Sequence, residues 1–221
     1  MKYKYILSTL LSVVLLCGCS DFLEVPPKDF VSDDELWKTT RNADLYLNDL
    51  YEQLPNLQST EQHLDQFSDN SDIGVLRHDG YKYIGQAQIT PENLPDGLGL
   101  WSWENRYKHI RKCNIFIQKV EASSLPDDYK TKRLAEARFL RAYFYHYLWM
   151  AYGGVPLITV PLNNQEPGAQ IEYPRATADE TFQFITNELN EIYDLLPAEV
   201  SGSDYGRVTK GVVLTLKRWW E

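Results

Sequence analysis

Hydrophobic residues return at helical spacing near the start of the polar part of this chain. Ser32-Asp33-Asp34-Glu35 has the form of a capping box, in which the first and fourth side chains bond the free backbone donors of a helix start. After it, apolar residues recur every three or four positions until Pro55. The spacing predicts one amphipathic helix over residues 32–54.

Two further helices follow from the same kind of pattern. In residues 101–120, five side chains recur at steps of four, three, four and three, which places them on one helix face. They are Trp103, Tyr107, Ile110, Asn114 and Ile117. We expect Trp103 to lie in the core. Residues 126–152 start with Pro126 and two acids and stop at Gly153-Gly154, which predicts a helix about 40 Å long.

The last part of the chain predicts a fourth and a fifth helix. Thr177-Ala178-Asp179-Glu180 is another capping box, and its helix should reach the residues before Pro197. The fifth helix should start after Gly206-Arg207 and run to the last residue.

The fold class expected from these elements is all-α with a helical-repeat core. A patch of small residues at 135, 137 and 142 would let helix backbones approach closely, and Ala135-x₃-Phe139 fits the tetratricopeptide pattern. Residues 56–100 instead carry turn signals such as Asp79-Gly80 and Asp96-Gly97. We therefore expect a long irregular loop region after the first helix, and such loops are usually functional or locally structured.

The first 31 residues have the pattern of an exported, lipid-anchored protein. A short basic start precedes an apolar run over residues 5–16, which is too short to span a membrane. Leu16-Cys17-Gly18-Cys19 then matches the lipobox of bacterial lipoproteins. The pattern predicts a signal peptide over 1–18, acylation of Cys19 and an extended tether over 19–31. An ordinary secretory signal that happens to contain two cysteines is the alternative.

Charge and composition narrow the classes of partner. The chain has 22 Lys+Arg against 31 Asp+Glu, a net charge of −9, and no basic cluster free of neighbouring carboxylates. A nucleic-acid reader needs such a cluster to replace condensed counterions, so nucleic acid is excluded as a partner. The 15 Tyr, 8 Phe and 6 Trp are enough to fill a core, which excludes a disordered chain.

The loop over residues 56–102 carries the mixture of side chains that sugar binding needs. Flat aromatic faces cover the C–H side of a pyranose, and polar groups bind its hydroxyls. The aromatic candidates are Tyr81, Tyr83 and Trp101, and the polar candidates are Asp69, Asp72 and Arg77. In the alternative interpretation, the two tyrosines are half-buried strand residues and Trp101 packs a helix start.

The sequence gives no comparable support for catalysis or for a metal. The pair Asp69 and Asp72 fits a turn, and Asp127 and Asp128 fit a charged first helical turn, rather than an acid–base pair. His109 and Cys113 share a helix face, but two ligands do not make a zinc site, so a buried pair is expected. We expect no cofactor and no bound metal.

One long segment resembles the hallmark of a known family. Residues 135–145, read together with Tyr152-Gly153-Gly154-Val155-Pro156-Leu157, are similar to the SusD/RagB family. Other stretches of the chain agree, and they occur in family order. They are the lipobox, Phe22-Leu23-Glu24, Trp103-x₃-Tyr107-x₂-Ile110-x₃-Asn114, Arg175-x-Thr177-x₂-Glu180, Leu195-Leu196-Pro197 and residues 206–211.

The resemblance implies a surface-exposed lipoprotein of the outer membrane with a tetratricopeptide-like core. It also implies a partner, a SusC-like TonB-dependent transporter, to which oligosaccharides or peptides are passed without breaking a bond. Family members are more than twice as long, so residues 32–221 are expected to be an N-terminal helical domain that is apparently truncated. Two alternatives stay open, namely a surface glycosidase or peptidase and a truncated, non-functional fragment.

Overall fold

The computed structural model describes residues 33–54, 102–163 and 172–218. These residues form helices joined by loops and contain no strand, which confirms the all-α fold class. The chain divides into two compact units, residues 1–36 and 37–221. Of the described helices, α2 (Asp33–Leu36) lies in the first unit and the others lie in the second. The loop predicted over 56–100 and the tether over 19–31 lie outside the described residues.

The helix predicted over residues 32–54 is in fact two helices, so that prediction was wrong. After α2, the chain leaves the helical conformation and starts again as α3 (Thr40–Glu52). The break comes at Thr39, which is extended, with φ −129° and ψ 146°, and whose hydroxyl accepts a hydrogen bond from the Asn42 amide at 3.2 Å. Trp37, just before the break, is buried with its ring 5.1 Å from that of Tyr46.

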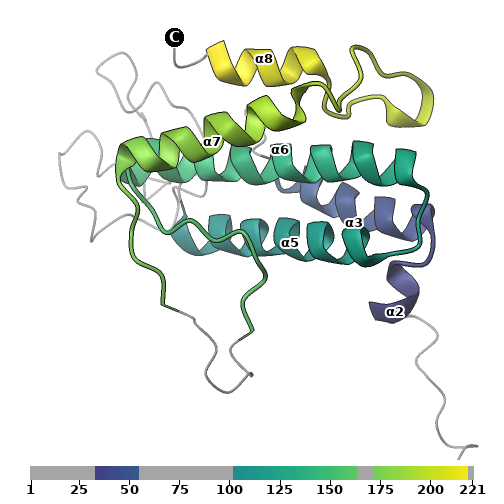
Figure 1. The fold of residues 1–221 in the computed structure, drawn as a ribbon, viewed down its shortest axis with the longest axis horizontal. Coiled ribbons are helices and arrows are strands. Elements are labelled where there is room, and N and C mark those ends of the chain that lie inside the picture. Colours follow the sequence, from purple (N-terminus) through teal and green to yellow (C-terminus); the bar gives the residue numbers. More distant parts are fainter. Residues whose placement is uncertain (1–32, 55–101, 164–171, 219–221) are drawn as a thin grey trace, which may run out of the picture. The chain divides into compact units, whose positions relative to one another are not determined.

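Helices α5 (Trp103–Ala122) and α6 (Asp127–Tyr152) are joined by a short loop and run antiparallel (Figure 1). The hydroxyl of Ser102 caps α5 by accepting from the Asn105 amide at 3.3 Å. Most of α6 from Arg133 to Leu148 is buried, as expected of a helix covered on several sides. The long third helix of the sequence analysis is thereby confirmed, with Pro126 at its N-cap and Gly153 at its C-cap.

Helix α7 (Ala178–Tyr193) starts with the predicted capping box. The Thr177 hydroxyl accepts from the Glu180 amide at 3.1 Å, and the Glu180 carboxylate accepts from the Thr177 amide at 2.7 Å. The helix ends at Tyr193, slightly before the predicted end. A short 3₁₀ helix, η4 (Gly202–Asp204), and α8 (Lys210–Arg218) complete the described chain.

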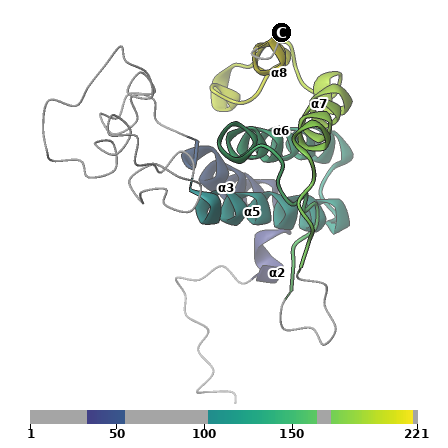
Figure 2. The ribbon, with the colours of Figure 1, turned by 90° about the vertical axis from the view of Figure 1, so that its left-hand side faces the viewer.

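Within the second unit, α6 lies in the middle, with α3 and α5 on one side of it and α7 and α8 on the other (Figures 1 and 2). Helix α6 contacts α5, α3 and α7, and α7 in turn contacts α8. The small residues at 135, 137 and 142 are buried, as their pattern predicted. The largest fully buried side chains come from α3, α5, α6 and α7: Leu47, Leu50, Ile110, Phe116, Leu140, Phe144, Tyr145, Leu148, Ile185, Leu189 and Ile192. No helix within the described ranges combines the length and the apolar character needed to cross a bilayer.

A group of ionised side chains fastens α3 and the loop before α8 to α6. We call it the α3–α6 ion cluster, and its members are Asp44, Arg133, Glu136, Asp204 and Arg207. Arg133 contacts Asp44 at 2.9 Å, Glu136 at 2.6 Å and Asp204 at 2.8 Å, and Arg207 contacts Glu136 at 3.1 Å. The cluster therefore joins residues that are about 160 positions apart in sequence.

The chain leaves α6 by a sharp turn that directs it along the side of α5. Gly153 has φ 67°, a left-handed value that favours glycine, and its amide bonds the Trp149 carbonyl at 2.9 Å. A Cβ on Gly154 would come within 1.9 Å of the Ala176 carbonyl oxygen, so only glycine fits there. The next residues, 155–163, contain no helix or strand, and we call them the strap.

Candidate functional site

The site residues predicted from the sequence fall where the structure gives no description. Cys19 and the six proposed ligand contacts, Asp69, Asp72, Arg77, Tyr81, Tyr83 and Trp101, all lie outside the described residues. Their assignments stay predictions. The described residues contain a cavity that the sequence pattern does not predict.

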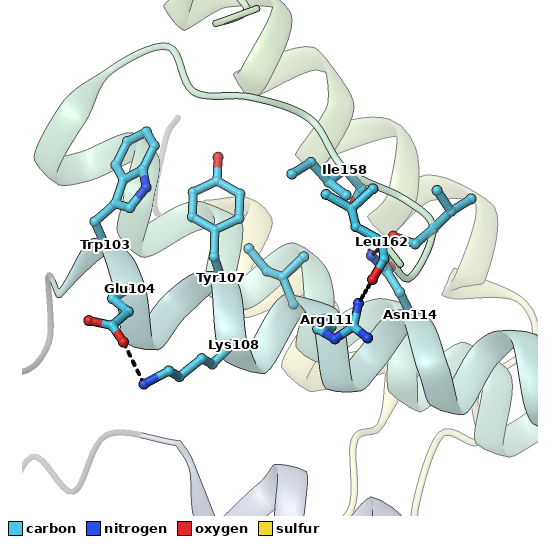
Figure 3. A pocket seen from close by; sticks show the side chains of 10 residues that line it. Trp103, Glu104, Tyr107, Lys108, Arg111, Asn114, Ile158 and Leu162 are labelled. Carbon is cyan, nitrogen blue, oxygen red and sulfur yellow. Dashed lines mark hydrogen bonds and ion pairs between the residues drawn. The ribbon is translucent and has the colours of Figure 1, made fainter. Parts of the chain in front are cut away.

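This cavity lies between one face of α5 and the strap, and we call it the α5 pocket. Its volume is about 400 Å³, within the ~300–1,000 Å³ range of small-molecule pockets. It is lined by Trp103, Glu104, Tyr107, Lys108, Ile110, Arg111, Asn114, Ile158, Val160 and Leu162. Figure 3 shows the Trp103 and Tyr107 rings rising from α5 on the side of the strap, with Ile158 and Leu162 farther along the opening.

Trp103 forms one end of the pocket and is not a core residue, so the sequence expectation for it was wrong. Its ring lies 5.0 Å from that of Tyr107, one helical turn away, and 5.1 Å from that of Tyr152 in an edge-to-face arrangement. The side chain remains 37% exposed. Trp103 is the first residue of α5, and its ring meets Tyr152, the last residue of α6, without being enclosed. The two rings give the pocket an aromatic wall.

Side chains of α5 hold the strap by its carbonyl groups. The Tyr107 hydroxyl donates to the Pro156 carbonyl at 2.7 Å, and the Asn114 amide donates to the carbonyls of Ile158 at 3.0 Å and Val160 at 3.3 Å. Arg111 donates to the Leu162 carbonyl (Figure 3). These bonds satisfy carbonyls that would otherwise need a neighbouring strand. The strap wall of the pocket is thus fixed by its backbone.

The Asn114 amide is itself oriented by residues of α6 and α7. Its oxygen accepts from Arg141 at 2.9 Å, which turns its nitrogen toward the strap. Arg141 in turn pairs with Glu188 at 2.6 Å, and both side chains are less than 10% exposed. Tyr145 adds a further contact, because its hydroxyl accepts from the Ile158 amide at 2.6 Å. Three helices therefore cooperate to place the strap.

The ionised groups at the pocket are predominantly cationic. Lys108 pairs with Glu104 at 2.7 Å, and this contact lowers the pKa of the Glu104 carboxyl below its usual value. Arg111 lines the same pocket, and the Arg175 guanidinium lies 6.0 Å from the centre of the Trp103 ring. Within the described part of the chain, neither arginine has a carboxylate within 4 Å.

Among its described lining residues, the pocket carries a single carboxyl group. Glycoside cleavage needs two carboxyl groups, one of them held protonated as an acid. Among the ten residues that line the pocket, Glu104 carries the single carboxyl group, and its lowered pKa keeps it ionised. Burial, followed by the proximity of Tyr145, raises the pKa of the Tyr107 hydroxyl, so this group stays a neutral donor.

Both predicted chemical pairs outside the loop lie within the described residues, and Asp127 and Asp128 stand in the first turn of α6 as expected. Cys113 is buried, and burial raises the pKa of its thiol to about 12, so it is not a reactive thiolate at neutral pH. His109 is half-buried beside it on α5. Over residues 33–54, 102–163 and 172–218, no three His, Cys, Asp or Glu side chains gather in a way that could hold a metal ion.

Sequence reasoning missed the pocket, although one signal for it was present. Trp103-x₃-Tyr107 places two aromatic rings on one helix face, and Arg111 follows on that face one turn later. The strap has no periodic pattern, so the partner wall could not be recognised. Arg141 and Asn114, which hold the strap wall in place, lie in segments that carry the family resemblance, but their contacts do not follow from the sequence pattern.

Comparisons with known proteins agree on one family. A SusD-like family model, described as starch-binding and associating with the outer membrane, matches residues 21–216. SusD-like protein P38 of Formosa agariphila is 30% identical over 218 residues, which cover 92% of this chain and 40% of that protein. A SusD-like protein of Bacteroides ovatus is 35% identical over 127 residues, or 56% of this chain and 21% of the relative. The chain therefore spans at most about two fifths of the length of these relatives.

Solved structures show the same fold. A SusD-like protein from Bacteroides fragilis superposes with a TM-score of 0.70 at 29% identity, covering 84% of this chain and 35% of that one. A structure described as a laminarin-binding SusD-like protein gives a TM-score of 0.69 over 82% of this chain and 39% of its own. The second is 23% identical, so it supports the fold alone.

Proposed function

This chain belongs to the SusD/RagB family, and on that basis we propose that it binds glycans at the cell surface without cleaving them. The observation that supports this most is the family match over residues 21–216, whose model is described as starch-binding. The α5 pocket is consistent with it, because an aromatic wall and one paired, ionised carboxylate suit binding and not hydrolysis.

The proposal includes a cellular location, the outer membrane, and a protein partner, a transporter. The lipobox supports a lipid anchor on Cys19 and a position on the outer membrane, since two or three acyl chains hold a protein on a bilayer essentially permanently. The family resemblance supports delivery of the captured glycan, or of a peptide, to a SusC-like TonB-dependent transporter. The predicted loop residues Tyr81, Tyr83, Trp101, Asp69, Asp72 and Arg77 are proposed as ligand contacts.

A glycan array and a chromatographic assay test the binding part. The purified protein is applied to an array of neutral, uronic-acid and sulfated oligosaccharides, and every bound oligosaccharide is then incubated with it and sized by chromatography. We expect binding to at least one class and no shortening of any oligosaccharide. Cleavage that is lost in Asp69→Asn or Asp72→Asn would instead establish a hydrolase.

The two cysteines of the lipobox region give a matched test of the anchor. We expect Cys19→Ala to abolish acylation and to release the protein from membranes, whereas Cys17→Ala, two residues earlier, should stay acylated and membrane-bound. Mass spectrometry of the protein from its native host reads the modification directly. A Cys19→Ala protein that remains acylated and on the membrane would contradict the assignment.

A further inference from the structure

We propose that the α5 pocket binds an acidic sugar, a pyranose that carries a carboxylate or a sulfate group. The inference rests on the proposed glycan-binding function and goes further, since it assigns a ligand class to one described site. The sugar ring would lie against Trp103 and Tyr107, and its anionic group would lie against Arg111 and Lys108.

The first argument is the local charge. The whole chain carries a net charge of −9, yet the pocket lining contains Lys108 and Arg111 against one carboxylate, Glu104. Toward the described residues, Arg111 uses one of its five N–H donors, on the Leu162 carbonyl, and it makes no ion pair with any of them. A guanidinium with unused donors matches the paired oxygens of a carboxylate or a sulfate.

The second argument is the balance of donors and acceptors. A neutral sugar presents hydroxyl groups that both donate and accept, so its site needs groups of both kinds. In the α5 pocket, the Asn114 amide and the Tyr107 hydroxyl are already bonded to strap carbonyls. Among the described lining residues, the remaining polar side chains are two cationic donors and the Glu104 carboxylate, which accepts from Lys108. This excess of donors favours a ligand rich in acceptor oxygens.

The third argument is the apolar surface beside those cations. The Trp103 ring, 37% exposed, and the Tyr107 ring form an aromatic wall, and the strap adds Ile158, Val160 and Leu162. The C–H face of a pyranose packs well on such a surface, whereas an inorganic anion would leave it uncovered. The pocket is therefore suited to an anion that is attached to a sugar ring.

Matched pairs of oligosaccharides test the proposal by isothermal titration calorimetry. Tetragalacturonate is compared with its methyl ester, in which each carboxylate becomes an uncharged ester, and sulfated laminari-oligosaccharide is compared with the unsulfated form. We expect the protein to bind at least one acidic member about tenfold more tightly than its neutral counterpart, and the two pairs distinguish a carboxylate from a sulfate.

Four variants connect that preference to the pocket. Arg111→Gln and Lys108→Gln should each weaken acidic binding, by about tenfold and severalfold, and Lys132→Gln, an exposed control on α6, should not. Glu104→Gln removes the one repelling carboxylate, so it should tighten acidic binding severalfold, a gain that lost stability could not produce. Circular dichroism of each variant confirms the fold, and Lys108→Gln keeps the test valid if Arg111→Gln unfolds.

The outcomes separate this inference from the proposed function. Equal binding of acidic and neutral oligosaccharides, or a preference that survives both Arg111→Gln and Lys108→Gln, would overturn the acidic-sugar assignment and leave glycan binding intact. Failure to bind any glycan on the array would overturn the proposed function itself. If a tetra-aspartate peptide binds as tightly as tetragalacturonate, the pocket recognises negative charge alone. That result would also overturn the acidic-sugar assignment.

Discussion

At the scale of single residues, Asn114 connects three helices to the strap. Its oxygen accepts from Arg141, which is paired with Glu188 of α7, and its nitrogen donates to two strap carbonyls. A buried ion pair of this kind adds little net stability compared with apolar packing, but loss of one partner leaves the other charge uncompensated. We therefore attribute to this pair the orientation of Asn114.

The variant Glu188→Gln tests whether buried Arg141 depends on this partner. Because Arg141 is buried, we expect the free energy of unfolding in urea to fall by about 3 kcal/mol. The matched control is Glu191→Gln on the same helix, whose carboxylate is 64% exposed against 9% for Glu188. It should cost less than about 1 kcal/mol. Equal losses in the two variants would show that the buried pair matters no more to stability than the exposed one.

Buried histidines make stability depend on pH. Burial lowers the pKa of His146 to about 4, and burial together with Arg106 and Lys112 lowers the pKa of His109 to about 4. Between that value and about 6.5, the unfolded chain binds protons that the folded chain does not. Above about pH 6.5, the two histidines are neutral in both states and the free energy of unfolding is at its full value. It falls as the pH drops from there toward 4.

Urea unfolding at pH 7.5 and pH 5 checks this with His146→Phe, which keeps an aromatic ring beside Tyr143 and Tyr147. We expect the variant to lose less stability between the two pH values than the wild type does. Identical losses would show that His146 is protonated in the folded protein at pH 5.

At the scale of elements, the turn after α6 decides where the strap runs. Arg175 donates to the carbonyls of Tyr152 and Gly154, both at 2.8 Å, so one side chain caps α6 and fastens the turn. The Val155 carbonyl then accepts from the Ala176 amide at 3.2 Å. The two ends of the connection between α6 and α7 are thus held together beside the pocket.

The variant Gly154→Ala tests the turn. Its Cβ would meet backbone atoms of Ala176 and Thr177, so we expect a loss of about 2 kcal/mol in unfolding free energy. Gly211→Ala is the matched control, since its Cβ would have its nearest neighbour at 3.7 Å. It lies in α8 and should leave stability unchanged or slightly higher. A Gly154→Ala protein as stable as the wild type would show that the backbone can relax.

The helices could be predicted wherever a local signal exists, and the strap could not. The capping box at Thr177 and the stop at Gly153-Gly154 depend on residues that are close in sequence, and both predictions are confirmed. The break at Thr39 was missed because the apolar spacing continues through it. The strap is held by side chains from α5, 44 to 51 positions earlier, and no periodicity encodes such contacts.

At the scale of the whole second unit, the α3–α6 ion cluster joins α3 to the loop before α8. Tyr51 of α3 contributes from outside the cluster, because its hydroxyl donates to Glu136 at 2.7 Å and accepts from the Val208 amide at 3.1 Å. Proximity of the Glu136 charge, after burial itself, raises the pKa of that hydroxyl. Glu136 therefore holds both α3, through Tyr51, and the loop before α8, through Arg207.

Limited proteolysis with trypsin tests this role of Glu136. In the wild type, the Arg207 side chain is 10% exposed, which protects the bond after it. We expect Glu136→Gln to release the loop and to speed cleavage after Arg207 or Lys210 several times over. Asp194→Asn is the control, because that carboxylate is 88% exposed in its contact with Lys210. Unchanged cleavage in Glu136→Gln would show that other contacts retain the loop.

The way in which the strap is held has a consequence for divergence within the family. The scaffold grips the main chain at positions 156, 158, 160 and 162, and it does not specify what those residues carry. Three of them nevertheless present their side chains to the cavity. Substitutions at positions 158, 160 and 162 can therefore change the wall of the cavity while the backbone hydrogen bonds stay in place. The strap can thus vary among family members independently of the helices that hold it.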